Sequence, residues 1–432
     1  MQVSQNVESI SSTQGKPGVY SLVVWLTGTL FYFYEFFIQV APNVMMPDLT
    51  RHFGITAAQF GFLATAYYAG YAMMQIPAGT LLDRFGARRL IVIATLICAL
   101  GSFLTAHANT WALVELARFA TGIGSAFAVL GSFVLAANWF PTNRFGLLSG
   151  FVLTFGMLGA VSGQHPMAVM VESIGWRESL DVLTVLGIAY AILTWFVIQD
   201  SKNPMGKNRL ITSQSFKELL SNVAKIIRQP QPWLLAAYGL LMFTPTLTLG
   251  ASWGAGFLIA AYDMPMTQAG SIISLIFIGW AIGCPVFGWV SDRMRLRKPP
   301  LYIASVGGTI CLFIIIYVHM PSTFMLGTIM LFFGIFSGAF LSSFSIAREL
   351  QPAKATGAAL GFMNMIQSMG GAILPPVVGT ILDLLWNGAM QDGGRIYRLS
   401  DYQHALLILP LEMLAAGLLL YFIKETYCKE AE

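Results

Sequence analysis

Long apolar runs separated by short polar breaks cover almost the whole chain. A membrane-spanning helix needs about 20 mostly apolar residues, and twelve runs meet that length: 20–46, 57–82, 89–107, 112–137, 145–170, 176–198, 233–261, 266–290, 300–319, 323–347, 355–384 and 403–424. Lipid offers no partner for unpaired backbone groups, so runs of this density are expected to be helices. The two-residue alternation typical of a membrane β-barrel is absent from the sequence. The pattern therefore predicts an all-α integral membrane protein with twelve transmembrane helices.

The composition supports this prediction. The 432 residues include 24 Lys and Arg and 20 Asp and Glu, so 10% are charged, against about 25% in ordinary soluble proteins. Such a chain is not disordered, and a soluble enzyme would need more surface charge. The net charge of +4 gives no reason to expect nucleic acid as a partner. The four cysteines form no CxxC pair, so neither a metal site nor a cofactor is expected.

The basic residues predict the orientation of the chain in the membrane. If the N-terminus lies inside, nineteen of the 24 Lys and Arg residues fall on the inner side and one, Arg118, falls within a span. The outer loops hold the remaining four, which are Arg51, Arg177, Arg395 and Arg398. By the positive-inside rule both termini are then cytoplasmic. We expect cytoplasmic tails at 1–19 and 425–432.

The longest inner loop, 199–232, separates spans 6 and 7. Within it, Ser213 to Ile227 carries apolar residues at a helical spacing, which predicts an amphipathic helix at the inner interface. The loop therefore divides the chain into an N-terminal bundle, 20–198, and a C-terminal bundle, 233–424. A plain linker is the simpler interpretation of the helix, and a regulatory or partner site is the alternative.

The turns after span 2 and after span 8 share one pattern. Each has a glycine, three residues, Asp-Arg and a basic cluster, as GTLLDRFGARR at 79–89 and GWVSDRMRLRK at 288–298. The two copies lie 209 residues apart, about half the chain. This predicts two six-helix halves of the same design, a plan known among transporters. Positive-inside topology alone is the alternative explanation. We expect a conformational gate at Gly79, Asp83, Arg84, Arg88, Gly288, Asp292 and Arg293.

These turns resemble the signature of the major facilitator superfamily. In span 4, the residues Arg118-x-x-x-Gly122-x-Gly124 are similar to a second motif of this family. Gly150, Gly159 and Gly163 in span 5 resemble the motif of antiporters in this family. The proline of that motif is replaced here by Gln164, which weakens an assignment to drug efflux.

Two apolar stretches resemble a narrower branch, the phagosomal nutrient transporters of intracellular bacteria. They are 32–45 in span 1 and 61–71 in span 2. That branch imports amino acids and, in some members, nucleosides.

The resemblance implies a secondary active transporter in the inner membrane that works by alternating access. We expect proton-coupled symport of a small polar nutrient, an amino acid or similar, by a monomer. The alternative is an organic anion or a siderophore, carried in either direction. The sequence has no GxxxxGK[ST] loop for an ATP-driven pump and no HExxH motif for a membrane enzyme. A channel would not need duplicated gates.

Charges within the spans are the first candidates for coupling to protons, because a charge in the bilayer is costly and usually functional. Glu35 lies near the middle of span 1, where an apolar site would favour the protonated carboxyl. Arg118 could pair with Glu115 or Glu35, or hold a substrate carboxylate by two hydrogen bonds. Structural hydrogen bonds or ion pairs are the alternative for both. For Glu412 in span 12, a packing role is the favoured interpretation.

Further polar residues in the spans are candidates for binding the solute. Tyr32 and Gln39 share a helix face with Glu35, and the pairs Tyr67–Tyr71 and Asn364–Gln367 each share a face. Interhelical hydrogen bonding, worth about 0.6–2 kcal/mol each, is the alternative role. The expected substrate-binding set is Tyr32, Glu35, Gln39, Tyr67, Tyr71, Arg118, Gln164, His165, Trp253, Asn364 and Gln367.

Overall fold

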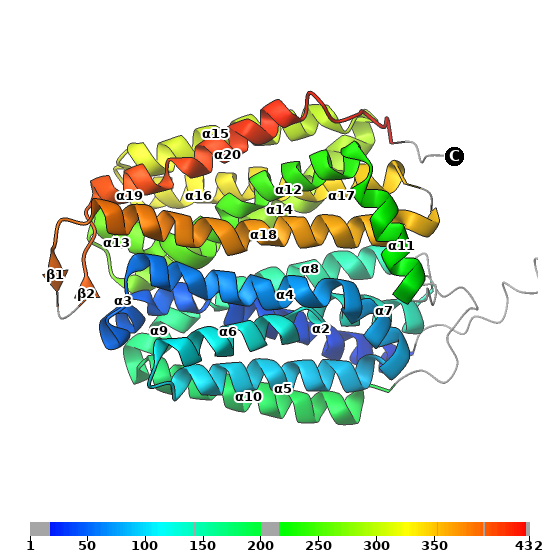
Figure 1. Cartoon of the computed structure of the whole chain (residues 1–432), viewed down its shortest axis with the longest axis horizontal. Helices are drawn as coiled ribbons and strands as arrows, with labels where there is room; N and C mark the ends of the chain where they lie inside the picture. Colours follow the sequence, from blue (N-terminus) through cyan, green and yellow to red (C-terminus); the bar gives the residue numbers. More distant parts are fainter. Residues whose placement is uncertain (1–17, 142–143, 200–215, 352, 392–393, 429–432) are drawn as a thin grey trace, which may run out of the picture.

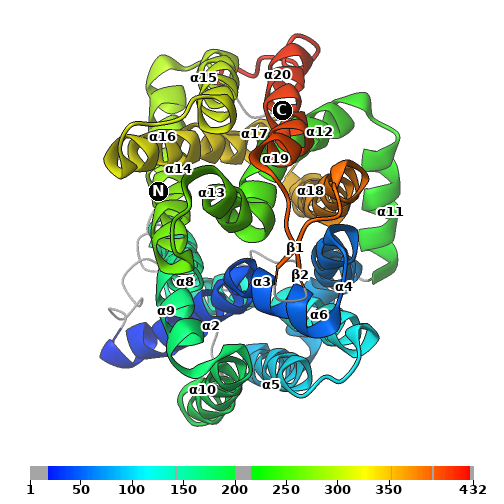
Figure 2. The same ribbon diagram turned by 90° about the vertical axis from the view of Figure 1, so that its left-hand side faces the viewer.

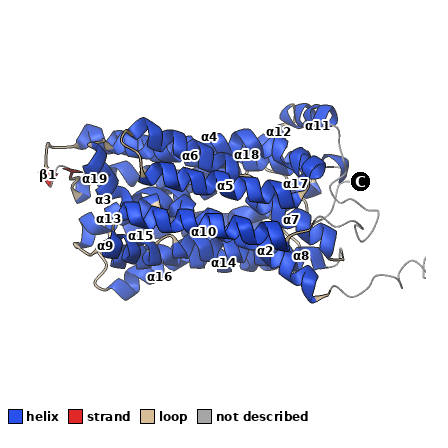
Figure 3. Ribbon diagram, turned by 90° about the horizontal axis from the view of Figure 1, so that it is seen from below, coloured by secondary structure: helices blue, strands red, loops and turns tan. Residues whose placement is uncertain are grey.

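The computed structural model of the chain describes residues 18–141, 144–199, 216–351, 353–391 and 394–428. Within these ranges the chain is helical almost throughout, with two short strands, β1 (Met390–Gln391) and β2 (Gly394–Arg395), at one end (Figure 3). The helices run roughly side by side along the long axis of the molecule (Figure 1).

In the described residues, the N-terminal half has nine α-helices that form six spans. These are α2 (Val19–Val40), α3 (Pro42–Phe53), α4 (Ala57–Phe85), α5 (Ala87–Ala106), α6 (Trp111–Ser125), α7 (Ala128–Trp139), α8 (Phe145–Ser162), α9 (His165–Ile174) and α10 (Trp176–Val197). A separate helix, α11 (Phe216–Ile227), follows in the linker and lies across one end of both halves (Figure 1).

The C-terminal half repeats the arrangement. It consists of α12 (Pro230–Thr248), the π-turn η2 (Leu249–Trp253), α13 (Gly254–Tyr262), α14 (Met266–Met294), α15 (Lys298–Tyr317), α16 (Thr323–Ser337), the 3-10 turn η3 (Gly338–Leu341), α17 (Ser342–Glu349), α18 (Ala353–Leu385), α19 (Leu399–Leu406) and α20 (Ile408–Leu419). The expected all-α membrane fold of two six-span bundles is confirmed.

Eleven of the twelve spans in the described chain are long and apolar enough to cross a membrane on composition alone. The twelfth is α4, which has 29 residues but carries several tyrosines and glutamines. It lies beside α18 at the seam between the halves, as both views show (Figures 1 and 2). Three of its polar side chains, Tyr67, Tyr68 and Gln75, are buried inside the protein, so this span can be less apolar than the others.

Two pairs of equivalent spans are interrupted in both halves. Span 1 breaks at Ala41 between α2 and α3, and span 7 breaks at η2. Span 4 breaks between α6 and α7, and span 10 breaks at η3. Broken helices are common where a transporter builds its binding site, because freed backbone groups then face a cavity rather than lipid.

The end of the molecule that carries β1 and β2 is here named the hairpin end, and the end that carries α11 the linker end. At the hairpin end the halves are in close contact. The carboxylate of Asp383, in the last turn of α18, accepts hydrogen bonds from the N–H groups of Ala57 at 3.1 Å and Ala58 at 2.8 Å. It therefore caps the N-terminus of α4 from the opposite half. Burial, with the hydrogen bond to Asp383 and the charge of that group, raises the pKa of Tyr397, which keeps its hydroxyl a donor to Asp383.

The glycines of the seam show where the halves approach. A methyl group at Gly61 would lie 2.5–2.6 Å from backbone atoms of Pro375 and Pro376, so only glycine fits there. Among the described glycines that lie within helices, five have no neighbouring atom within 4 Å of an added methyl group: Gly79, Gly150, Gly288, Gly357 and Gly361. All five lie in the parts of their helices nearest the linker end. The described residues therefore show the halves packed most tightly at the hairpin end.

Candidate functional site

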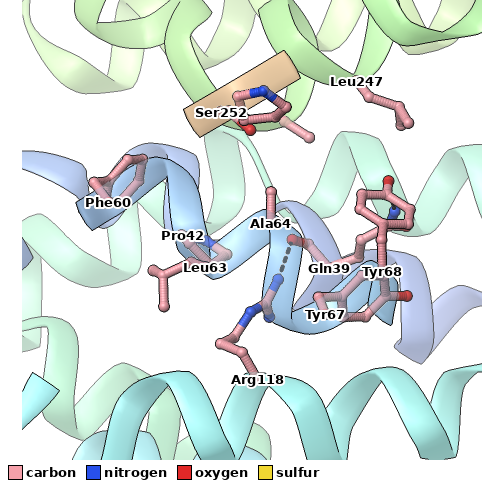
Figure 4. Close-up of a pocket in the computed structure, with 12 residues that line it drawn as sticks. Gln39, Pro42, Phe60, Leu63, Ala64, Tyr67, Tyr68, Arg118, Leu247 and Ser252 are labelled. Carbon is pink, nitrogen blue, oxygen red and sulfur yellow. Dashed lines mark hydrogen bonds between the residues drawn. The ribbon is translucent and has the colours of Figure 1, made fainter. Parts of the chain in front are cut away.

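The candidate site begins with a break in span 1. Pro42 has no backbone N–H, so the carbonyl of Ile38 loses the donor that an unbroken helix would supply. The carbonyl of Gln39 also lies in the last turn of α2, where carbonyls lack intrahelical partners. The guanidinium group of Arg118, on α6, donates to the carbonyl of Ile38 at 2.9 Å and to that of Gln39 at 3.0 Å, and Figure 4 shows the second of these bonds. The proline break thus creates the acceptors that hold this arginine.

Among the described residues, no carboxylate lies within ion-pair distance of Arg118. Only 8% of the residue is exposed, and neither Glu35 nor Glu115 lies within ion-pair distance. The alternative of an ion pair with Glu35 or Glu115 is thus not seen in this conformation, in which the guanidinium group donates to two carbonyls of the broken helix instead. Its Nε–H is buried without a hydrogen-bond partner. The site consequently holds a buried positive charge with unused N–H donors, the Nε–H among them.

Tyr67 connects this charge to Glu35. Its hydroxyl donates a hydrogen bond to Oε1 of Glu35, a residue only 2% exposed. Its ring face lies 5.0 Å from the guanidinium carbon of Arg118, a cation–π geometry, and stacks on Tyr71 at 6.2 Å between centroids. Tyr67 therefore touches both predicted coupling residues.

A small cavity adjoins Arg118 at the seam. Its volume is about 20 Å³, which is room for water but not for an organic solute. In this conformation the candidate site is thus contracted, and a solute would need the halves to separate. Both halves supply its walls: Gln39, Pro42, Phe60, Leu63, Ala64, Tyr67, Tyr68 and Arg118 from the N-terminal half, and Leu247, Ala251, Ser252 and Pro375 from the C-terminal half (Figure 4).

Gln39 adds a second free polar atom to this wall. Its Nε2 lies 2.5 Å from the hydroxyl of Tyr68, while its Oε1 is buried and unpaired. The free donor of Arg118 and the free amide atom of Gln39 are suited to a small polar ligand.

The predicted residues of the C-terminal half lie around this cavity rather than in it. Trp253 donates from Nε1 to the carbonyl of Pro375 at 3.0 Å and packs edge-on against Phe60. Asn364 donates to Gln75 across the seam at 3.0 Å. Gln367 is 1% exposed, and neither of its amide atoms has a hydrogen-bond partner.

Three further predicted residues are dispersed. Tyr32 packs edge-on against Phe36, at 4.9 Å between centroids. His165 is exposed, and its Nδ1 lies 2.8 Å from the hydroxyl of Ser271 on α14. Gln164 is fully buried near the hairpin end and does not line the cavity.

The gate residues of the first turn lie at the linker end of α4 and the start of α5. Arg88 lies over the ring of Trp195 at 4.3 Å, and Arg84 lies 5.3 Å from the ring of Phe85. The side chain of Asp83 falls outside the described part of the structure. The roles of these residues as a gate stay predictions.

The second turn is organised around Arg297, a residue that the sequence did not single out. Arg297 donates to Glu349 at 2.5 Å and to Asp292 at 2.6 Å. Burial alone would lower the pKa of Arg297, but the hydrogen bonds to the two carboxylates outweigh it and raise the pKa. Arg293, the predicted gate residue, is exposed. Glu349 is 52 positions from Arg297, so no local spacing could have indicated the pair.

We expect Glu349→Gln to destabilise the protein, because it leaves Arg297 with a buried charge and a weaker partner. The loss should be about 3 kcal/mol, visible as a lower melting temperature of the purified protein. Asp292→Asn is the matched control, since the Asp292 side chain is 69% exposed and should cost less than about 1 kcal/mol. Equal losses in the two variants would contradict this account.

The fold and the site together define a multi-pass membrane protein whose halves enclose a polar site, as in transporters. The family model described as Major Facilitator Superfamily matches residues 25–375, and the chain belongs to that family.

Curated relatives cover most of the chain at low identity. A protein described as a probable sulfoacetate transporter of Cupriavidus necator is 25% identical, over 82% of this chain and 85% of its own length. A D-galactonate transporter of Escherichia coli is 25% identical, over 78% and 83%. A hexuronate transporter of Bacillus subtilis is 23% identical, over 84% and 87%.

Solved structures show the same fold. A bacterial homolog of the human lysosomal transporter Spinster, in an inward-facing and occupied conformation, superposes with a TM-score of 0.78 at 17% identity. The alignment covers 94% of this chain and 97% of that one. The nucleoside transporter NupG superposes with a TM-score of 0.72, at 17% identity, over 92% and 98%. The protein is therefore a transporter and not an enzyme. Its place in the narrower phagosomal branch stays a prediction.

Proposed function

We propose that the protein carries a small organic anion, a carboxylate or a sulfonate, across the inner membrane together with a proton. The observation that supports this most directly is Arg118, a buried cation with no carboxylate within ion-pair distance that adjoins a cavity between the halves. An anion is the ligand that such a charge lacks. The relatives named for sulfoacetate, galactonate and hexuronate transport are consistent with this class.

An amino acid, which the resemblance implies, is less well supported by the site. Its ammonium group would need a free carboxylate beside Arg118. Glu35 is the nearest candidate in span 1, but the Tyr67 hydroxyl occupies one of its oxygens. Glu35 is also absent from the walls of the cavity.

In this proposal Glu35 is the group that binds and releases the proton. When Glu35 is protonated, the site carries the single positive charge of Arg118 and attracts an anion. When Glu35 loses its proton, the two residues together are neutral and the attraction falls. Tyr67 transmits the change, because its hydroxyl bonds to Glu35 and its ring covers Arg118. A monoanion and a proton then cross as a neutral pair, which avoids moving net charge through the low-dielectric interior.

We further propose that the halves 20–198 and 233–424 move as units around the 199–232 linker, in the manner of alternating access. The conformation seen here is packed at the hairpin end. If the linker end is cytoplasmic, as the basic residues predict, the site is closed to the outside in this state.

Counterflow in proteoliposomes tests the proposal. Vesicles loaded with unlabelled sulfoacetate, galactonate, a hexuronate or an amino acid are given the same labelled solute outside. We expect trans-acceleration with at least one of the organic anions and none with zwitterionic amino acids. Acceleration by amino acids alone would overturn the anion assignment, and an absence of acceleration with every solute would overturn this substrate range.

A further inference from the structure

A buried cluster of amides joins the halves close to the hairpin end. Nδ2 of Asn43, at the start of α3, donates to Oε1 of Gln164 at 3.0 Å and to the carbonyl of Gly250 at 3.1 Å. Nε2 of Gln164 donates to the same carbonyl at 2.9 Å. Asn43 and Gln164 are both 0% exposed. Two side chains of the N-terminal half thus hold one backbone oxygen of the C-terminal half.

The π-turn η2 makes that oxygen available. In an α-helix the N–H of Gly254 would bond to the carbonyl of Gly250, four residues earlier. Here it bonds to the carbonyl of Leu249, five residues earlier. The Gly250 carbonyl is left without its α-helical donor and accepts from the amides of Asn43 and Gln164 instead. A side chain at Gly254 would collide with the Leu249 carbonyl, so this turn requires glycine.

The partner in the N-terminal half also depends on a local break. Gln164 lies between α8 and α9 with φ −101° and ψ −96°, outside helical geometry. It stands where the antiporter motif of the family has proline. A proline there has neither a side-chain donor nor a side-chain acceptor. The departure from the motif therefore supplies the amide that reaches across the seam.

The amide cluster adjoins the candidate site on both sides. The cavity beside Arg118 is lined by Pro42, which precedes Asn43, and by Ala251 and Ser252, the two residues that follow Gly250. A solute in the cavity would touch the residues adjacent to each side of the cluster. Any rearrangement of η2 needed to accommodate the solute would move the Gly250 carbonyl.

We propose that Asn43, Gln164 and the Gly250 carbonyl form a latch between the halves, here named the amide latch. It holds the transport path closed at the hairpin end, and η2 is the element whose rearrangement releases it. Asn43 and Gln164 are positioning residues, since they act through η2 rather than on the solute. The proposal does not depend on the identity of the solute.

Side-specific labelling tests the amide latch without any solute. The reporter is Ser252→Cys, which lines the cavity, in full-length protein that also carries Cys428→Ser. The three remaining cysteines, Cys98, Cys284 and Cys311, are buried. Sealed vesicles are treated with a membrane-impermeant maleimide. A separate Met390→Cys variant, exposed in β1, identifies the membrane side on which the hairpin end lies.

We expect Gln164→Leu and Asn43→Leu each to speed labelling from the hairpin side by about tenfold, because each removes interhelical hydrogen bonds from the closed state only. Labelling from the linker side should slow. Ser132→Ala is the control, because it removes a buried hydrogen bond within the N-terminal half, to the carbonyl of Gly28, and leaves the contacts between the halves in place. It should leave labelling from the hairpin side unchanged.

Three results would overturn the proposal. One is an unchanged rate from the hairpin side in both latch variants. Another is an equal acceleration by Ser132→Ala. The third is faster labelling from both sides, which would indicate general loosening of the fold rather than release of a latch. If one latch variant does not yield folded protein, the other carries the test.

Discussion

Arg118→Lys is expected to reduce uptake of the organic anion by at least about a hundredfold. The guanidinium group meets two carbonyls at 2.9 Å and 3.0 Å and lies over the ring of Tyr67. A lysine ammonium is a compact point charge and cannot match this planar arrangement. Part of the charge would move away from the cavity, and the bidentate contact with a carboxylate or sulfonate would be lost.

Initial uptake rates in proteoliposomes measure this effect, and Arg51→Lys is the control. Arg51 is also an arginine of the N-terminal half, but it is exposed at the hairpin end. It should keep the rate of the parent protein. The melting temperature of Arg118→Lys separates loss of function from loss of fold. A folded Arg118→Lys protein with uptake within threefold of the parent would contradict the role of Arg118 as the anion anchor.

The fold could be predicted from the sequence because the membrane imposes a strong constraint on each span separately. About 20 apolar residues must follow one another, and the backbone must be helical. Even α4, the least apolar span, could be predicted because apolar residues still outnumber its tyrosines and glutamines and its flanking turns are clear. The duplication could be found because two turns of charged residues repeat the same local pattern.

The candidate site could be predicted only in part, because its contacts join residues that are distant along the chain. Charges are scarce in the spans, and this pointed to Glu35 and Arg118. It did not show that carbonyls at the break before Pro42 would accept hydrogen bonds from Arg118. Asn43 and Ser252 were missed because single amides and hydroxyls in an apolar run carry no periodic signal. Gln164, which stands where the family motif has proline, was the one sequence signal for the amide latch. Its acceptor, the carbonyl of Gly250, is free only because of the π-turn η2, which no sequence pattern indicated.

Glu35→Gln is expected to abolish uptake driven by a proton gradient while preserving exchange of the anion. Glutamine is close in size to a protonated glutamate and can still accept from the Tyr67 hydroxyl, so the site keeps its positive charge and its shape. It cannot release a proton, however, so the attraction between Arg118 and the anion no longer changes during the cycle. Uptake should therefore lose its dependence on the pH gradient, and counterflow should persist.

The test compares pH-driven uptake and counterflow in the same vesicles, with Glu412→Gln as the matched control. Glu412, on α20, is the other carboxyl group deep within a predicted span, and its Oε2 is buried without a hydrogen-bond partner. It does not line the cavity beside Arg118, so its replacement should leave pH-driven uptake intact. Loss of pH-driven uptake in Glu412→Gln with retention in Glu35→Gln would transfer the coupling role to the C-terminal half. Retention in both variants would exclude each carboxyl group as the proton site.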